Sequence, residues 1–256
     1  MITDSFDASG KELISALDGV SRKALEAAKK YQIRTFIITF SKKLIDYLCE
    51  TGQIELLDED LYFGSAAGKN PVYRIPGTET GVFLSGIGAM MSAAMIEELS
   101  AAFQCRNYIF YGSCGVLTEI PEGKLIIPIE AYRDEGVSYH YAQASDYIRM
   151  KNAPVLEKIF DQAGVGYVTG KTWTTDAFYR ETERNRDRRS EEGCICVEME
   201  CSALQAVCDF RGLELYHFLY GADSLKGSWQ RRILGDPEMD SRIAFFSLAK
   251  MIAEHI

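Results

Sequence analysis

An acidic step at residues 197–200, Val-Glu-Met-Glu, has the side chains that bind a sugar. It follows an apolar, β-leaning run, and a helical pattern begins at Cys201, so Glu198 and Glu200 are expected at a strand-to-helix junction. A carboxylate there accepts hydrogen bonds from two neighbouring hydroxyls, as ribose offers, and Met199 supplies an apolar wall. The alternative is an acidic pair at a helix start, stabilised by the helix dipole.

A second carboxylate, Asp223, is expected just past a strand at residues 215–220. If the two strands are neighbours, Glu200 and Asp223 face one crevice. A carboxylic acid beside a departing purine can protonate or hydrogen-bond its N7, which cleavage of an N-glycosidic bond requires. Alternatively, Asp223 caps a turn with its side chain.

Two glycine-containing segments are candidate ligand loops. Gly86 and Gly88 lie between a strand and a helix, where backbone N–H groups can approach a small ligand, although Met91 replaces the third glycine of a dinucleotide fingerprint. The second segment follows a predicted strand at 108–111 and has the composition of an anion-binding turn: Gly112, Ser113, Cys114 and Gly115. Its alternative is a tight turn that needs glycine dihedrals.

The periodicity of the chain predicts alternating helices and strands. Strands are expected at 35–40, 72–75, 81–84, 108–111, 124–132, 167–172, 194–197 and 215–220. Helices are expected at 10–32, 41–50, 90–103, 154–163, 182–192, 201–210 and 239–255, the last introduced by Asp236-Pro237, with a loop at 133–147. The order strand, glycine-rich turn, helix, strand indicates a βαβ unit, and without a linker or repeat residues 1–256 are expected to form one α/β domain.

Composition narrows the function classes. Lys+Arg number 28 against 37 Asp+Glu, a net charge of −9, which makes nucleic acid an unexpected partner. Seven cysteines without a Cys-x-x-Cys spacing indicate buried, reduced residues and no metal site. The first 13 residues do not read as a signal peptide, and no apolar run is long enough to cross a membrane, so a cytoplasmic protein is expected.

An ordered set of segments resembles the nucleoside phosphorylase-I family, which includes purine nucleoside phosphorylases, uridine phosphorylases and methylthioadenosine/S-adenosylhomocysteine nucleosidases. The segments follow the family's order and are residues 86–88, 112–115, 134–141, 175–179, 197–200 and 222–223. The resemblance implies a three-layer α/β/α fold with a central mixed, largely parallel sheet. It also implies a homo-oligomer, a hexamer or a dimer.

The resemblance assigns a role to each matching position. Glu200 is expected on the ribose 2'- and 3'-hydroxyls with Glu198 supporting it, Phe178 against the base, and Asp223 on the leaving group. Ser113 matches the residue that binds phosphate. The substrate-binding set implied is Met199, Glu198, Phe178, Gly86, Gly88, Ser113, Cys114, Gly115, His140 and Arg184. His140 has the alternative of a loop histidine satisfied locally, and Arg184 that of a solvated helix face.

The sequence departs from the family where phosphorolytic members carry two phosphate-binding arginines. Phe40 and Leu44 stand at the glycine and arginine of the Gly-Asp-Pro-x-Arg motif, and Phe110 at the second arginine. A phenylalanine cannot replace the bidentate hydrogen bonds of a guanidinium. Phosphate is therefore expected on Ser41, Lys42, Lys43 and Ser113, and on Lys69 from a neighbouring subunit.

The nature of the base and of the nucleophile stays open at this stage. Residues 178–184 resemble the uridine enzymes, with Thr182 in place of a glutamine, whereas Asp223 favours a purine. Hydrolytic members use a glutamate after the first strand, and residues 41–45 contain no acid. The expectation is a phosphorylase of purine salvage that forms a free base and ribose 1-phosphate, with inorganic phosphate as co-substrate and no other cofactor. The alternatives are a phosphate-independent nucleosidase and a non-catalytic nucleoside-binding protein.

Overall fold

The computed structural model describes residues 1–65, 68–232 and 237–256, without the side chain of Ser65. A mixed, largely parallel sheet forms its centre, in the order β11-β10-β8-β12-β7-β1-β6-β5-β2, with β9 beside β8. Its strands are β1 (Thr35–Thr39), β2 (Glu55–Leu56), β5 (Tyr73–Arg74), β6 (Thr80–Leu84), β7 (Asn107–Val116), β8 (Leu125–Asp134), β9 (Tyr147–Arg149), β10 (Tyr167–Thr175), β11 (Cys194–Glu198) and β12 (Glu214–Ser224). A separate hairpin pairs β3 (Tyr62–Ser65) with β4 (Gly68–Pro71).

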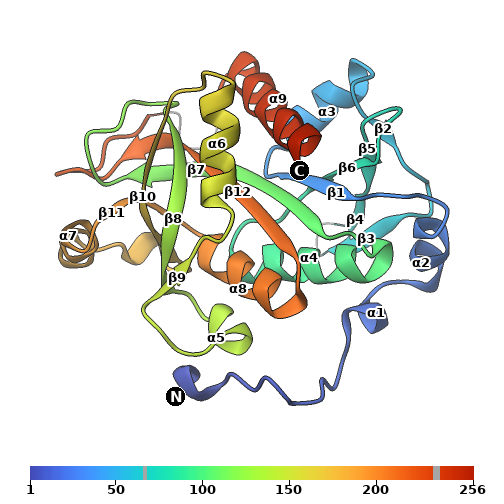
Figure 1. The fold of residues 1–256 in the computed structure, drawn as a ribbon, viewed down its shortest axis with the longest axis horizontal. Helices are drawn as coiled ribbons and strands as arrows, with labels where there is room; N and C mark the ends of the chain where they lie inside the picture. Colours follow the sequence, from blue (N-terminus) through green and yellow to red (C-terminus); the bar gives the residue numbers. More distant parts are fainter. Residues whose placement is uncertain (66–67, 233–236) are drawn as a thin grey trace.

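Helices cover both faces of the sheet, which confirms the three-layer α/β/α architecture (Figure 1). One layer contains α3 (Lys42–Glu50), α6 (Ala153–Gln162) and α9 (Met239–His255). The other contains α4 (Ala89–Phe103), α5 (Ser138–Tyr141) and α8 (Cys201–Arg211), and α1 (Ala16–Gly19) and α2 (Arg22–Ala28) pack on α4. The highly charged α7 (Glu183–Glu191) lies against β11, and short 3-10 turns form η1 (Ile2–Asp4) and η2 (Phe178–Arg180).

The sheet closes on itself around one glycine. Gly115 near the end of β7 pairs with Asp223 of β12 on one side and with Val197 of β11 on the other. A Cβ atom at this position would lie 2.4 Å from Cδ1 of Leu225 and 3.1 Å from Cγ1 of Val197. Glycine leaves room there for the side chains of Leu225 and Val197, and its pairing on both sides brings β11 and β12 next to the same residue of β7.

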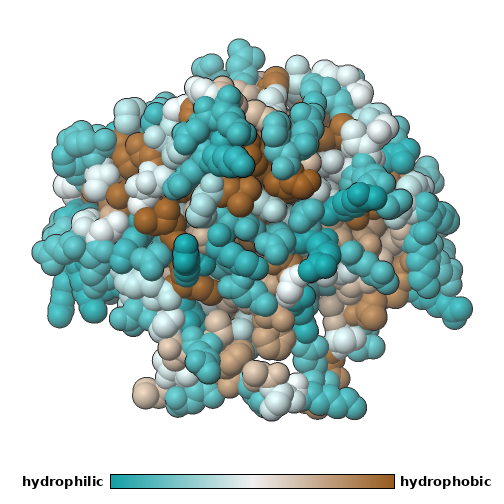
Figure 2. Space-filling model, in the orientation of Figure 1, coloured by the Kyte–Doolittle hydropathy of each residue, from teal (hydrophilic) through white to brown (hydrophobic). Residues whose placement is uncertain are grey.

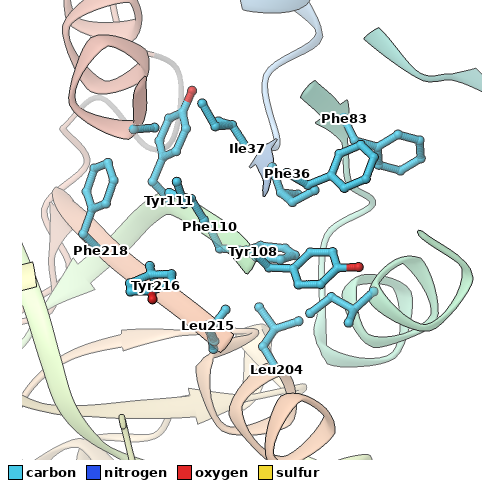
Figure 3. Packing of buried hydrophobic residues seen from close by; sticks show 14 of the residues in the cluster. Phe36, Ile37, Phe83, Tyr108, Phe110, Tyr111, Leu204, Leu215, Tyr216 and Phe218 are labelled. Carbon is cyan, nitrogen blue, oxygen red and sulfur yellow. The ribbon is translucent and has the colours of Figure 1, made fainter. Parts of the chain in front are cut away.

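Large apolar side chains of β1, β6, β7 and β12 fill the space between sheet and helices (Figure 3). Successive residues of a strand point to opposite faces, so Tyr108 and Phe110 pack on one side and Tyr111 on the other. Tyr111 stacks on Phe218 with ring centroids 5.3 Å apart. On the face drawn in Figure 2, hydrophilic residues dominate and hydrophobic ones appear in small groups. No helix of the described residues is both long and apolar enough to cross a membrane.

Three predicted elements differ from the structure: two segments expected at turns lie within strands, and one expected helix is divided into two. Residues 112–115 were expected to form a turn, but β7 continues through them to Val116, because each of them has a partner in β12. Asp223 likewise lies within β12 and not beyond it. The expected helix at 10–32 is interrupted at Val20, whose backbone is extended, and α2 starts anew with Ser21 as its cap. The last helix begins at Met239 as expected, while Asp236 lies outside the described residues.

Gly115→Ala is expected to destabilise the protein by about 1–3 kcal/mol, because the new methyl group would force Leu225 and Val197 aside. Urea unfolding measures the loss as a shift in the midpoint. Gly64→Ala is the matched control, since its Cβ atom would have nothing within 4 Å. Equal midpoints for both variants would contradict the close-packing role of Gly115.

Candidate active site

A cavity of about 390 Å³ opens where β1, β7, β11 and β12 end. The carboxyl ends of neighbouring parallel strands are the usual ligand-binding edge of an open α/β sheet. The cavity is lined by Thr39, Phe40, Ser41, Leu44, Ile87, Tyr111, Gly112, Ser113, Cys114, Gly115, Phe178, Glu181, Val197, Glu198, Met199, Glu200, Tyr220, Asp223, Leu225, Arg242 and Phe245. Most residues singled out from the sequence are therefore brought together at one site.

Glu200 is fixed at the start of α8 by a contact with the opposite side of the cavity. Its Oε1 atom accepts a hydrogen bond of 2.6 Å from the backbone N–H of Gly88, the N-cap residue of α4. Gly88 has a φ of 97°, a conformation that favours glycine. Burial, followed by the charge of Glu198, raises the pKa of Glu200 to about 8. The N–H of Gly88, expected to meet a ligand, is instead directed at the carboxylate that is expected to hold the sugar.

Glu198 fixes the backbone at Glu200 through hydrogen bonds to the start of α8 and to β10. Its Oε1 atom accepts hydrogen bonds from the hydroxyls of Thr174 at 2.5 Å and Thr172 at 3.3 Å. Its Oε2 atom accepts from the backbone N–H groups of Glu200 and Cys201, both at 2.7 Å. Burial raises the pKa of Glu198, and the bonds from Thr174 and the two N–H groups oppose that shift. Glu198 thus holds the first turn of α8 and orients Glu200.

Asp223 reaches the cavity because β12 contains a bulge. The register between β12 and β7 shifts between Gly221 and Asp223, so Ala222 is the extra residue. Oδ2 of Asp223 accepts a hydrogen bond of 2.7 Å from the indole N–H of Trp229, which is 56% exposed. The sequence analysis placed Glu200 and Asp223 in one crevice on the condition that their strands are neighbours. The strands β11 and β12 do not pair with each other, but both flank Gly115 of β7, and the two residues line one cavity.

A fourth acidic residue of the cavity wall, Glu181, was missed as a site residue. It directly follows η2, whose Phe178 also lines the cavity and is 42% exposed. Burial, and then the neighbouring charge of Asp223, raises the pKa of Glu181 to about 7. A carboxyl group with such a pKa exchanges protons near neutral pH, as an acid or base catalyst must. The available signal was its place in the 178–184 segment, of which only Phe178 and Arg184 had been given roles.

The structure also brings an arginine into the cavity that sequence analysis did not identify. Arg242 of α9 is 6% exposed and lines the cavity together with Ser41 and Ser113. It is the only cationic residue among the described residues of the cavity wall. Its location depends on the packing of α9 against β1 and α3, a contact between distant parts of the chain that no local pattern indicates.

Several expected site residues lie elsewhere. His140 is exposed on α5, and Arg184 is exposed on α7. Lys42 and Lys43 are exposed on α3, where Lys42 pairs with Asp46. Lys69 lies over the ring of Tyr62 at 4.1 Å, and Gly86 accepts a hydrogen bond from Ser92. The lining of the cavity does not include these expected residues of the same chain: Gly86, Gly88, His140, Arg184, Lys42 and Lys43. The expectation for Lys69 concerns a neighbouring subunit and stays a prediction.

Cys114 lines the cavity but is buried, and burial raises the pKa of its thiol well above the ordinary value. Its Sγ atom lies 3.5 Å from the carbonyl oxygen of Tyr220, to which the thiol donates. A protonated thiol is a poor nucleophile, so Cys114 serves as a small wall residue. Within the described residues, His, Cys, Asp and Glu side chains form no group suited to a metal ion.

The three-layer fold and this cavity, with its carboxylates and the partly exposed Phe178, define an α/β protein with a candidate small-molecule site at strand ends. The chain belongs to the phosphorylase superfamily, whose family model matches residues 20–240.

Sequence relatives are purine nucleoside phosphorylases of the DeoD type. The chain is 28% identical over 132 residues to the one from Aliivibrio fischeri, covering 50% of this chain and 55% of the relative. It is 26% identical over 145 residues to the one from Caldanaerobacter subterraneus, covering 55% of this chain and 62% of the relative. The chain thus matches little more than half the length of these relatives.

Solved structures share the fold over nearly the whole chain. A purine nucleoside phosphorylase from Toxoplasma gondii has a TM-score of 0.70 at 17% identity, covering 88% of this chain and 91% of its own. An AMP nucleosidase from Bacteroides thetaiotaomicron has a TM-score of 0.69 at 18% identity, covering 89% and 90%. A futalosine hydrolase from Helicobacter pylori has a TM-score of 0.66 at 16% identity, covering 88% and 100%. One fold therefore accompanies transferases and hydrolases alike.

Glu181→Gln is expected to stabilise the protein at alkaline pH only. The pKa of Glu181 in the folded protein, about 7, lies above the ordinary 4.5, so its contribution to stability falls as the pH rises from 4.5 to 7. The variant should unfold like the wild type at pH 4.5 and gain roughly 1 kcal/mol by pH 8, measured in urea. Glu59→Gln, at an exposed position, is the control. A gain that does not change with pH would contradict the burial of Glu181.

Proposed function

We propose that this protein is a nucleoside phosphorylase that cleaves the N-glycosidic bond of a purine nucleoside with inorganic phosphate. The observation that carries the proposal is that Glu200, Met199, Phe178 and Asp223 line one cavity. The proposal includes phosphate as co-substrate without a further cofactor, and a homo-oligomer in the cytoplasm that takes part in purine salvage.

The proposed reaction exchanges one bond at the sugar for another. Phosphate oxygen attacks C1' as the bond from C1' to the base breaks, and the electron pair of that bond leaves with the base. Glu200 fixes the ribose through its hydroxyls, and Phe178 packs against the base. Asp223 hydrogen-bonds or protonates the base nitrogen, with Trp229 holding the carboxyl group in place. Catalysis then consists of orienting the sugar and stabilising the departing base.

A purine is favoured over uracil by the position of Asp223. Its carboxylate lines the cavity at the bulge of β12, whereas Arg184, which would favour a uridine enzyme, is exposed on α7. The segment that resembled uridine enzymes therefore contributes Phe178 and Glu181 to the cavity and not its arginine. A base with a ring nitrogen to accept a proton suits this wall better than one without.

A second candidate, a phosphate-independent nucleosidase, is supported by Glu181. A carboxyl group with a pKa of about 7 on the cavity wall can take a proton from water and so activate it. Free ribose would then replace ribose 1-phosphate as the product. The phosphorylase ranks first because hydroxyl groups of Ser41 and Ser113 and the guanidinium of Arg242 line the same cavity, as an anionic co-substrate requires.

Incubation with inosine, adenosine, guanosine and uridine, with and without phosphate, should release a purine base only when phosphate is present. Chromatography of the products should show ribose 1-phosphate in equal amount to the base. Formation of free ribose in phosphate-free buffer would contradict the phosphorylase proposal and support the nucleosidase. Thermal stabilisation by a nucleoside without any product would instead indicate a non-catalytic binding protein.

Glu200→Gln is expected to lower kcat/KM for the nucleoside by at least about 100-fold, because the amide has a single acceptor oxygen, which already accepts from Gly88, and its NH2 group cannot accept from the sugar hydroxyls. The amide oxygen can still accept from Gly88, so the urea midpoint should change little. A matched control is Glu130→Gln, at a residue of β8 outside the cavity. Full turnover in Glu200→Gln would remove the sugar-binding assignment.

A further inference from the structure

The positions where relatives were expected to carry phosphate-binding arginines are apolar in this structure. Phe40 and Phe110 pack against each other with ring centroids 6.3 Å apart, and Leu44 is 1% exposed. The ring of Phe40 would lie 3.3 Å from a Cβ atom placed on Gly112, so it fills the space beside β7. No cation can reach the cavity from these three positions.

Arg242, on the last helix of the chain, lines the same cavity as Phe40 and Leu44. Its Nε atom donates a hydrogen bond of 2.9 Å to the carbonyl oxygen of Pro237, and its Nη1 atom donates to Oγ of Ser41. These bonds, with 94% of the residue removed from solvent, fix the guanidinium at the beginning of α3. Thr39, Tyr220 and Phe245 line the cavity as well.

Ser41 is oriented so that its hydroxyl can donate. Its Oγ atom accepts from the backbone N–H of Leu44 at 3.2 Å and from Arg242. A hydroxyl oxygen has two lone pairs and one proton, so with both lone pairs engaged the O–H proton points elsewhere. Ser41 and Ser113 both line the cavity, and their hydroxyls together with the guanidinium form a donor-rich wall. Such a wall suits a tetrahedral oxyanion.

We infer that Arg242 and Ser41 bind a phosphoryl oxyanion and take the place of the two absent arginines. The inference rests on the proposed function for the identity of the second ligand, a nucleoside held by Glu200. The phosphoryl group can be free orthophosphate, the nucleophile of phosphorolysis, or the 5'-phosphate of a nucleotide substrate. Both present the same oxygens to the guanidinium, and the two sources differ in whether the phosphate arrives with the sugar.

Binding of inorganic phosphate tests this site without any need for turnover. Phosphate should raise the melting temperature of the wild type relative to sodium chloride of equal ionic strength, and Arg242→Met should lose at least 90% of that rise. Lys250→Met, on the same helix but outside the cavity, should keep it. Arg242→Lys, which keeps the charge without the fork, should retain a part and serves if the methionine variant does not fold.

Kinetics separate a phosphate-binding role from a structural one. With a nucleoside as substrate, Arg242→Met should raise KM for phosphate by at least about 30-fold and change KM for the nucleoside by less than about threefold, and Ser41→Ala should follow with a smaller rise. An equal increase in the KM values for phosphate and for the nucleoside would overturn the inference. Stabilisation of Arg242→Met by phosphate to the same extent as the wild type would also overturn it.

A parallel arm replaces the nucleoside and phosphate by a nucleoside 5'-monophosphate. If only the nucleotide stabilises the wild type and Arg242→Met loses that effect, the oxyanion belongs to the substrate and the site stands. If neither phosphate nor the nucleotide distinguishes Arg242→Met from the wild type, the inference fails. Absence of any base release with phosphate still stabilising through Arg242 would sink the proposed function and leave this site intact.

Discussion

The buried carboxylate of Glu198 determines where Glu200, the proposed sugar-binding residue, lies in the cavity wall. It joins four donors from β10 and from the first residues of α8, and thereby fixes the step from strand to helix that presents Glu200. A carboxylate in such surroundings is strongly bound because each of its oxygens has two partners. Asp223 lies close to this junction because Gly115 of β7 pairs both with Asp223 and with Val197, the residue before Glu198.

Local signals predicted much of the fold. Ser41 was expected to cap α3, and its side chain accepts from Leu44 as a cap does. The bounds of α9 agree with the prediction, and the paired strands at residues 72–84 are β5 and β6. These elements have periodicity and end signals within their own residues. The predicted ends of β7 and β12 were wrong because the glycine and serine residues there are typical of turns. The conformation of these residues is set by the pairing between the two strands.

The candidate site likewise contains residues that the sequence predicted and residues that it did not. Glu200, Met199, Phe178, Asp223 and Ser113 were expected and line one cavity, since each lies in a segment with a recognisable order. Arg242 was not expected because a single arginine on an amphipathic helix reads as a surface residue, and only the packing of α9 on β1 turns it inward. Lys42 and Lys43 had the right charge, but α3 directs them to its exposed side. Charge near a site is predictable from sequence, whereas its direction requires the tertiary structure.

The bond between Gly88 and Glu200 links the cavity to the outer surface of the molecule. Gly88 caps α4, and α4 is the helix on which α1 and α2 of the N-terminal segment rest. On the proposed function, a ribose bound at Glu200 would compete with this N–H group, and the end of α4 would respond to the ligand. Hydrogen exchange in α1 and α2, which pack on α4, would then report binding at a distance.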